Sequence, residues 1–392
     1  MSVESIYPSI RVSGEPLERG RQYGVLARDR ILRSREGYER AFRHATGDDW
    51  LGAVASVAHL VDSVEGAFPN YWAEMQGIAE GSGLPFADIF TMNARTEVIW
   101  AAAARRSLKP GSSLARECTA IAAVPPRSGV TTYVAQNWDW LIHSRETLIV
   151  LEVEQAEAPN FVTVVEAGLL AKASLNSAGV GVAVNALVSS LDRAETGIPF
   201  HVLIRALADV TTVGEAIRVT AAHARASSGN YVVAHSDGVA VNLETSPGGP
   251  EGVTVTVPSN GLLCHANHFL APLTRGHDLA VRELADSWIR QQRVESMMAN
   301  EARLLDAHVL FAQLADHADF PNSLCCHPDE SDHIDDRWST VASIVMDLRE
   351  RSLRLVDGNP CTGKQRTLTF GDFLAPDLAR APRPPLERID GP

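Results

Sequence analysis

Hydrophobic and polar positions repeat along this chain with two different periods, and the changes of period divide it into blocks. Over residues 16–46, apolar side chains such as Tyr23 and Ile31 recur at helical spacing among many charged residues. The first hundred residues are therefore predicted to be mainly helical. Residues 105–117 (RRSLKPGSSLARE) break the pattern, because their Arg, Ser, Pro and Gly content does not suit a buried helix or strand. This segment is interpreted as an exposed connector.

The apolar period shortens to that of β-strands from Cys118 onward. Two β-rich runs, CTAIAAV and VTTYVAQNW, flank the breaker PPRSG and predict a hairpin whose first residue is Cys118. Strand-like and helical blocks then alternate, which favours two packed antiparallel sheets covered by helices, an α+β layered sandwich. Strands are expected at residues 147–155, 161–168, 172–187, 230–245, 252–264 and 339–358, and helices at 199–224, 277–299 and 301–317.

Length and composition narrow the class of protein. With 392 residues, of which 45% are hydrophobic, the chain can bury a large core. No apolar run reaches the ~18 residues of a membrane helix, and the first residues do not resemble a secretory signal, so a cytoplasmic location is expected. The formal net charge of -13 disfavours nucleic acids and anionic membranes, which leaves small molecules as expected partners. Five irregularly spaced cysteines do not form a disulfide framework.

These features predict three parts in the chain. Residues 1–117 form a helical N-terminal segment that ends in the connector, and residues 118–370 form the main region. Residues 371–392 contain five prolines, which cannot donate backbone hydrogen bonds, so this tail is predicted to lie irregularly on the surface.

Cys118 is the first candidate for chemistry. A single cysteine is usually an inert core residue, but Cys118 directly follows the connector and begins a strand. If the bond before it is cut, its α-amine, with a usual pKa of about 7.7–8.0, lies beside its own thiol, with a usual pKa of about 8.5. One residue then supplies both the base and the nucleophile, with no histidine needed. Further polar residues gather in QNWDW and HANH.

Several short motifs follow one another along the chain. They are SGEPLERGRQYG, MQGIAEGSGLPFADIFTMNARTE, ECTA, AQNWDW, EAGLLAKASLNSAGVGVAVNAL, TGIPFHVLIRAL, LETSP, CHANHF, DSWIRQQR and FPNSLCCHPD. In this series the sequence resembles the isopenicillin N acyltransferase family of self-processing cysteine N-terminal-nucleophile (Ntn) enzymes. The resemblance implies the four-layer αββα sandwich of the Ntn-hydrolase fold, a cut between Glu117 and Cys118, and two chains that stay associated.

The resemblance also implies roles for individual residues. Cys118 would be the nucleophile, Asp139 would orient the new amine, and the side-chain amide of Asn267 would donate to the oxyanion of the tetrahedral intermediate. Side chains expected to line the substrate, or to support the site, are Asn176, Asn185, His268 and Cys326.

Three positions depart from the fungal pattern of this family. Glu117 stands before the nucleophile where a glycine is familiar, and Ala120 stands where a second threonine is familiar. Both positions adjoin the expected cut. Cys326 replaces an arginine that could bind a substrate carboxylate, which argues against a penicillin-type anionic substrate.

Other kinds of site fit the sequence less well. Cys325, Cys326, His327 and His333 offer metal-ligand types, but adjacent cysteines rarely reach one tetrahedral ion and no Cys-x2-Cys pair accompanies them. No HExxH, Walker A or GxSxG motif is present. Neither a metal nor a cofactor is therefore expected.

The sequence leaves three functions open. A thioester at Cys118 resolved by water gives an amidohydrolase of small acyl amides, whereas one resolved by an amine gives an acyltransferase that could use acyl-coenzyme A. We favour hydrolysis, because the chain is acidic and its clearest basic cluster lies on the connector. The third function is an unprocessed binding protein, which would not need Cys118, Asp139 and Asn267 together.

Overall fold

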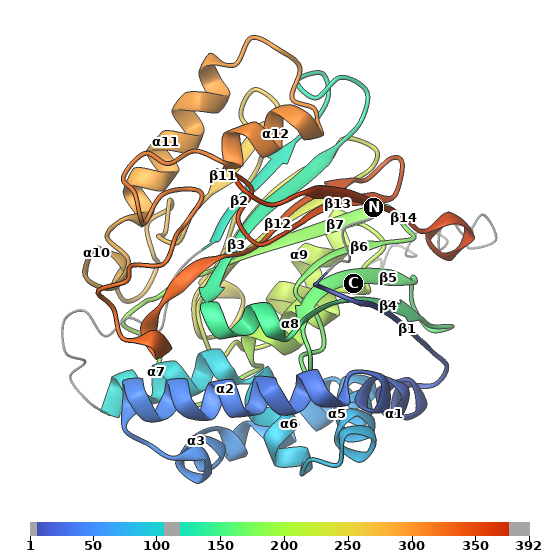
Figure 1. The fold of residues 1–392 in the computed structure, drawn as a ribbon, viewed down its shortest axis with the longest axis vertical. Coiled ribbons are helices and arrows are strands. Elements are labelled where there is room, and N and C mark those ends of the chain that lie inside the picture. The colour runs from blue at the N-terminus through green and yellow to red at the C-terminus, as the bar shows by residue number, and fades with distance from the viewer. Residues whose placement is uncertain (1–5, 106–117, 376–392) are drawn as a thin grey trace, which may run out of the picture.

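The computed structural model describes residues 6–105 and 118–375. Two β-sheets lie at its centre (Figure 1). The eight-stranded sheet has the order β1 (Ser9–Ser13), β4 (Leu148–Glu154), β5 (Phe161–Glu166), β6 (Ala173–Asn176), β7 (Val180–Ala186), β8 (Gly229–His235), β9 (Ala240–Thr245) and β10 (Val253–Thr256). The six-stranded sheet has the order β11 (Leu262–His265), β2 (Cys118–Ala123), β3 (Tyr133–Leu141), β12 (Trp338–Asp347), β13 (Ser352–Asp357) and β14 (Gln365–Thr369).

Helices cover both outer faces of this pair of sheets. α8 (Phe200–Ala208) and α9 (Val213–Ala222) pack on the eight-stranded sheet, and α11 (Ser287–Asn300) and α12 (Ala307–Leu314) pack on the six-stranded one. β2 and β3 contact β7 and β8 of the opposite sheet. The order of layers is therefore α, β, β, α, which confirms the predicted α+β sandwich.

A block of seven helices packs at one end of the sandwich (Figure 1). These helices confirm the predicted helical character of the N-terminal segment. Among the helices that the structure describes, none combines the length and the apolar character needed to cross a bilayer. The bounds are α1 (Pro16–Leu26), α2 (Arg28–Thr46), α3 (Trp50–Val57), α4 (Val61–Ala67), α5 (Pro69–Ser82), α6 (Phe86–Asn93) and α7 (Arg95–Arg105).

Glycines allow the backbones of α1 and α5 to touch. These glycines belong to two of the sequence motifs. A Cβ atom on Gly20 would lie 2.2 Å from the carbonyl oxygen of Glu74, and one on Gly77 would lie 2.1 Å from that of Leu17. Only glycine allows backbones to approach this closely. The motifs RGRQYG and QGIAEG thus form one helix–helix contact.

The observed elements differ from the predicted ones in several places. β1 pairs with β4 in parallel, so the eight-stranded sheet is not wholly antiparallel. Neither β1 nor β14 was predicted, because these edge strands have only five residues each and bury few of them. The predicted run 252–264 contains two strands, β10 and β11, that belong to different sheets.

Two predicted helices are also shorter than expected, and the tail differs. The stretch 277–299 contains the one-turn α10 (Ala280–Glu283) before α11, and 301–317 contains only α12. The tail was predicted to lie on the surface from residue 371, but Phe373 and Leu374 are buried in the core beside the sandwich. Apart from Arg105, which ends α7, the connector lies outside the described residues.

Candidate active site

Cys118 is the first residue of β2 and is buried between the two sheets, with 4% of its surface exposed. Its backbone nitrogen donates a 2.9 Å hydrogen bond to Oδ1 of Asn267. Its carbonyl oxygen accepts from Nδ2 of Asn185 at 2.9 Å and from Nη1 of Arg290 at 3.2 Å. Three side chains from distant segments therefore fix the main chain on either side of the thiol.

Asn267 follows β11, and several hydrogen bonds fix its position. Its backbone nitrogen donates to Oγ of Ser287, at 2.7 Å. Its Oδ1 also accepts from Arg290 at 3.1 Å, and one N–H of its amide donates to the carbonyl oxygen of Ala186 at 2.9 Å. The amide oxygen thus faces Cys118, whereas the resemblance assigned a role only to the amide nitrogen.

Arg290, on α11, is a site residue that the sequence analysis did not single out. Its guanidinium is fully buried, forms an ion pair with Asp286 at 3.1 Å, and donates to Thr119 Oγ1 at 3.1 Å in addition to Cys118 and Asn267. The motif DSWIRQQR contained the signal, because an Asp and an Arg four residues apart on a helix form a pair. Nothing in the motif indicated that this pair would be buried.

Asp139 lies on β3 with no exposed surface. Its Oδ1 accepts a 2.6 Å hydrogen bond from Oγ1 of Thr340, and its Oδ2 accepts none from the residues that the structure describes. Burial raises the pKa of this carboxyl to about 7, although the charge of Arg290 and the Thr340 hydrogen bond oppose the shift. Asp139 can therefore gain or lose a proton near neutral pH.

The surroundings of the Cys118 thiol act on its pKa in opposite directions. Burial raises that pKa, and the charge of Asp139 adds to the rise. The positive charge of Lys172 lowers it, as do hydrogen bonds from the Gln136 side chain and the Asp139 backbone. Lys172 is itself buried, which lowers its pKa to about 8, and its Nζ lies 5.4 Å from the centre of the Trp138 ring. Lys172 and Gln136 occur in the quoted motifs but were not predicted as site residues.

The predicted substrate-lining residues fall in different places. Asn185 contacts Cys118, as described above. The amide of Asn176 donates to the carbonyl oxygens of Ala208 and Val210 and accepts from the nitrogen of Val180, so its bonds hold backbone together. We therefore leave Asn176 out of the site.

His268 and Cys326 support the site from its edges. Nδ1 of His268 lies 2.8 Å from Oγ of Ser287, and its ring stacks on Trp288. Burial lowers the pKa of His268 to about 4, so its imidazole is neutral at pH 7. The Cys326 backbone is hydrogen-bonded to Thr340, the partner of Asp139. Glu117 lies outside the described residues.

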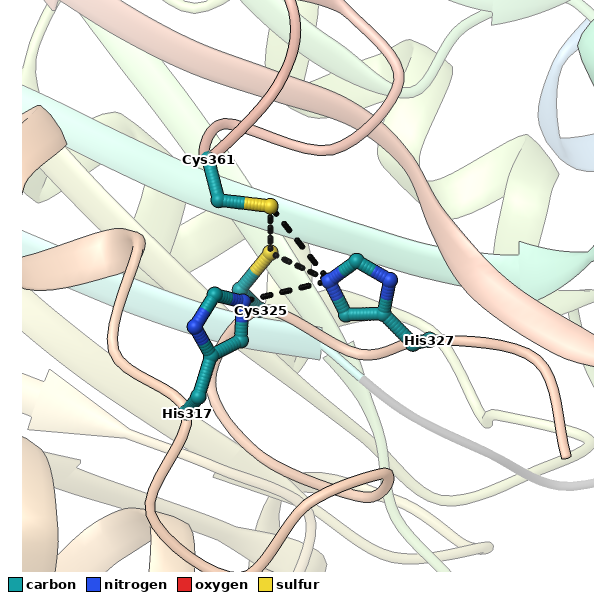
Figure 2. A group of neighbouring side chains, drawn as sticks. All are labelled: His317, Cys325, His327 and Cys361. Atoms are coloured by element: carbon teal, nitrogen blue, oxygen red, sulfur yellow. Dashed lines mark hydrogen bonds between the residues drawn. The ribbon is translucent and has the colours of Figure 1, made fainter.

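A second group of reactive side chains lies apart from Cys118. It consists of His317, Cys325, His327 and Cys361, whose ligand atoms all lie within 4.8 Å of one another (Figure 2). Of the four residues weighed as metal ligands from sequence, only Cys325 and His327 belong to it. His333 instead stacks on His44, and the backbone nitrogen of Cys326 donates to Oγ1 of Thr340.

Comparison with known proteins identifies the class of this protein. The family described as acyl-coenzyme A:6-aminopenicillanic acid acyl-transferase matches residues 127–362. The chain belongs to this family, and it is an enzyme. It is 27% identical over 356 residues to the 40 kDa form of acyl-coenzyme A:6-aminopenicillanic-acid-acyltransferase from Emericella nidulans, a match that covers 90% of this chain and 92% of the relative.

Solved structures also match this chain, at low identity and with TM-scores under 0.5. An N-acylethanolamine-hydrolyzing acid amidase orthologue from Caenorhabditis elegans matches with a TM-score of 0.43 and 16% identity, over 59% of this chain and 93% of that chain. Penicillin V acylase from Agrobacterium tumefaciens matches with a TM-score of 0.42 and 14% identity, over 66% of this chain and 88% of that chain.

Proposed function

We propose that this enzyme is activated by cutting its own chain between Glu117 and Cys118, and that it then cleaves the amide bond of a small acylated amine or amino acid through a thioester on Cys118. The observation that carries the proposal is the fixed main chain of Cys118. Asn267 holds its nitrogen, and Asn185 and Arg290 hold its carbonyl oxygen. An inert core cysteine has no need of three buried side chains on its backbone.

The first reaction is an N-to-S acyl shift. The Cys118 sulfur attacks the carbonyl carbon of Glu117, the C–N bond of the peptide breaks, and the thiol proton passes to the departing nitrogen. Water then hydrolyses the thioester, which leaves a carboxyl group on Glu117 and a free thiol and α-amine on Cys118. Asp139 is the buried group suited to move the proton before the amine exists, because its pKa is about 7.

The second reaction uses the new amine as the base. It takes the thiol proton as the sulfur attacks the substrate carbonyl, and it returns the proton to the leaving amine as the substrate C–N bond breaks. Asn267 Oδ1 already accepts from this nitrogen and would keep the amine oriented. We propose that the second N–H of the Asn267 amide donates to the oxyanion, since the first donates to Ala186.

Hydrolysis is the proposed outcome for the thioester, with transfer to an amine as the second candidate. The relative from Emericella nidulans is named as an acyltransferase that uses acyl-coenzyme A, which supports the second candidate. The net charge of -13 disfavours a highly anionic coenzyme A donor and favours a neutral or cationic amine on the substrate. The buried Cys326, in place of an arginine, also disfavours an anionic penicillin-type substrate.

An acyl-enzyme experiment tests this proposal. The purified protein is mixed with a panel of acyl amides and acyl thioesters, quenched in acid and measured by mass spectrometry. A substrate should add the mass of its acyl group to the peptide that begins with Cys118, and added amine acceptors should divert product from acid to amide only if transfer occurs. Binding of substrates with no acyl adduct and no turnover would favour the alternative of an unprocessed binding protein.

A further inference from the structure

A cluster of two cysteines and two histidines lies where three segments of the chain meet. His317 follows α12, Cys325 and His327 lie in the segment that leads to β12, and Cys361 lies in the connection between β13 and β14. The four side chains point toward a common centre (Figure 2). Cys325 is buried, whereas His317 is exposed, so the cluster lies at the surface of the sandwich.

Four of the six distances between the ligand atoms are close to those around a tetrahedral metal ion. The two sulfurs lie 3.5 Å apart, each sulfur lies 3.4 Å from Nε2 of His327, and the Nε2 atoms of His317 and His327 lie 3.1 Å apart. With Zn–S bonds of about 2.3 Å and Zn–N bonds of about 2.0–2.1 Å, a tetrahedron has edges of about 3.8, 3.6 and 3.3 Å for the same pairs. These four edges are shorter by only a few tenths of an ångström, and the two edges from His317 to the sulfurs are at most 4.8 Å.

We propose that His317, Cys325, His327 and Cys361 bind one Zn²⁺ ion as a closed structural site. Two thiolates and two neutral imidazoles are the ligand set that Zn²⁺ favours, and four protein ligands leave no open position for catalysis. Binding releases two protons, one from each thiol, and the two thiolates balance the charge of the ion. The site is distinct from Cys118 and adds a metal where the sequence led us to expect none.

Asn359 supplies the second layer of contacts that such a site needs. Its Nδ2 lies 3.5 Å from the sulfur of Cys325 and donates to the carbonyl oxygen of Cys326 at 2.6 Å. Its Oδ1 accepts a hydrogen bond from Arg145, so the Nδ2 end of the amide is the one that faces the sulfur. An N–H group directed at a thiolate stabilises the charged form that binds the metal.

The proposed ion would hold a segment that contacts the catalytic region. Cys326 lies between two ligands, and its backbone nitrogen donates to Oγ1 of Thr340 at 2.9 Å while its carbonyl oxygen accepts from the Thr340 nitrogen at 2.9 Å. The Thr340 hydroxyl is thereby left to donate to Asp139. Loss of the ion should therefore loosen the support of Asp139 as well as reduce stability.

Metal analysis of the full-length protein tests the site. After removal of any affinity tag, dialysis against Zn²⁺ and then against buffer, the wild-type protein should retain one zinc ion per chain. The variants Cys361→Ser and His317→Ala should retain no zinc after the same dialysis. Cys264→Ala and His333→Ala are matched controls, because these residues lie outside the cluster, and both should retain one ion.

A cobalt experiment on the wild-type chain needs no variant to fold. Co²⁺ bound by two thiolates and two imidazoles should give the strong visible absorption of a tetrahedral site and thiolate charge-transfer bands in the near ultraviolet. A weak octahedral spectrum, zinc retention that is equal in Cys361→Ser and Cys264→Ala, or no retained zinc would overturn the proposal. A disulfide between Cys325 and Cys361 in cell extracts kept under reducing conditions would also overturn the proposal. Mass spectrometry would detect it as a mass lower by two hydrogens.

Discussion

The backbone nitrogen of Cys118 donates a 2.9 Å hydrogen bond to Oδ1 of Asn267, a residue 149 positions further along the chain. In the intact chain this nitrogen belongs to the peptide bond that we propose is cut, and in the cut chain it becomes the α-amine. The same amide oxygen can therefore orient the nitrogen before and after activation. Arg290 holds that oxygen from the other side, at 3.1 Å.

Two replacements of Asn267 should show that the N–H donor of its amide accounts for most of its effect on turnover. Asn267→Ala should lower turnover by about 10²–10³, the usual effect of removing one oxyanion donor. Asn267→Asp keeps an acceptor for the Cys118 nitrogen but removes the N–H donor, so it should be comparably slow. Steady-state kinetics on folded, cut protein measure both effects, with the exposed Asn300→Ala as a control. Turnover within a few-fold of wild type in both variants would remove Asn267 from the site.

Asp139→Asn should change how activity depends on pH. Because the pKa of Asp139 is about 7, wild-type activity should fall as pH drops below 7 and the carboxylate gains a proton. The variant lacks this ionisation, so its activity should be low throughout, and the ratio of wild-type to variant activity should rise with pH. A ratio that stays constant from pH 5.5 to 8.5 would contradict the assigned role.

The same variant should alter stability with a definite sign. The folded pKa of about 7 lies above the usual value near 3.9, so the fold favours the protonated carboxyl. The stabilising contribution is complete below the unfolded pKa and is lost as pH rises toward 7. The melting temperature of Asp139→Asn, relative to that of wild type, should therefore increase as the pH is raised from 4 to 8. An unchanged difference would mean that the carboxyl titrates as it does in water.

Lys172→Met should make the Cys118 thiol harder to ionise. The buried cation is the largest influence that lowers the pKa of this thiol, so its removal should raise that pKa and slow the reaction of the thiol near neutral pH. The rate of alkylation at the Cys118 peptide, followed by mass spectrometry as a function of pH, measures the change. The exposed Lys364→Met is the control, and equal profiles in the two variants would exclude the effect.

The contact between α1 and α5 gives a test of the fold. A methyl group on Gly77 would lie 2.1 Å from the carbonyl oxygen of Leu17, so Gly77→Ala should lower the free energy of unfolding by roughly 1–3 kcal/mol. Gly66→Ala, in α4, meets nothing within 4 Å and should instead raise it by about 0.5–1 kcal/mol, the usual gain in a helix. Denaturant titration compares the two, and equal effects would contradict this explanation of the glycine motifs.

The sequence predicted the layers of helices and strands more completely than the side-chain contacts at the candidate site. Apolar periodicity located most core strands, because β2 and β3 are buried along their whole length. It missed β1, whose pairing with β4 depends on a partner more than a hundred residues away. Cys118, Asp139 and Asn267 were predicted through motifs, and the structure brings Asn267 to the Cys118 backbone.

Other site residues could not be predicted, for a physical reason. Arg290 and Lys172 have ordinary surface side chains until the fold buries them beside Cys118. His317 lies 10 residues before His327 and Cys361 lies 34 residues after it, a spacing that matches no common zinc motif. Tertiary contact alone brings these groups together.

The central claim is that the chain is cut between Glu117 and Cys118, and denaturing mass spectrometry with N-terminal sequencing tests it most directly. The active protein should contain one chain of 117 residues and one of the remaining 275, which begins with Cys118 and stays associated under native conditions. Cys118→Ala should remain one uncut chain with no activity, whereas Cys118→Ser should still be cut, more slowly, because an oxygen nucleophile can make the same shift. An intact and fully active single chain, or activity that survives in Cys118→Ala, would contradict the account.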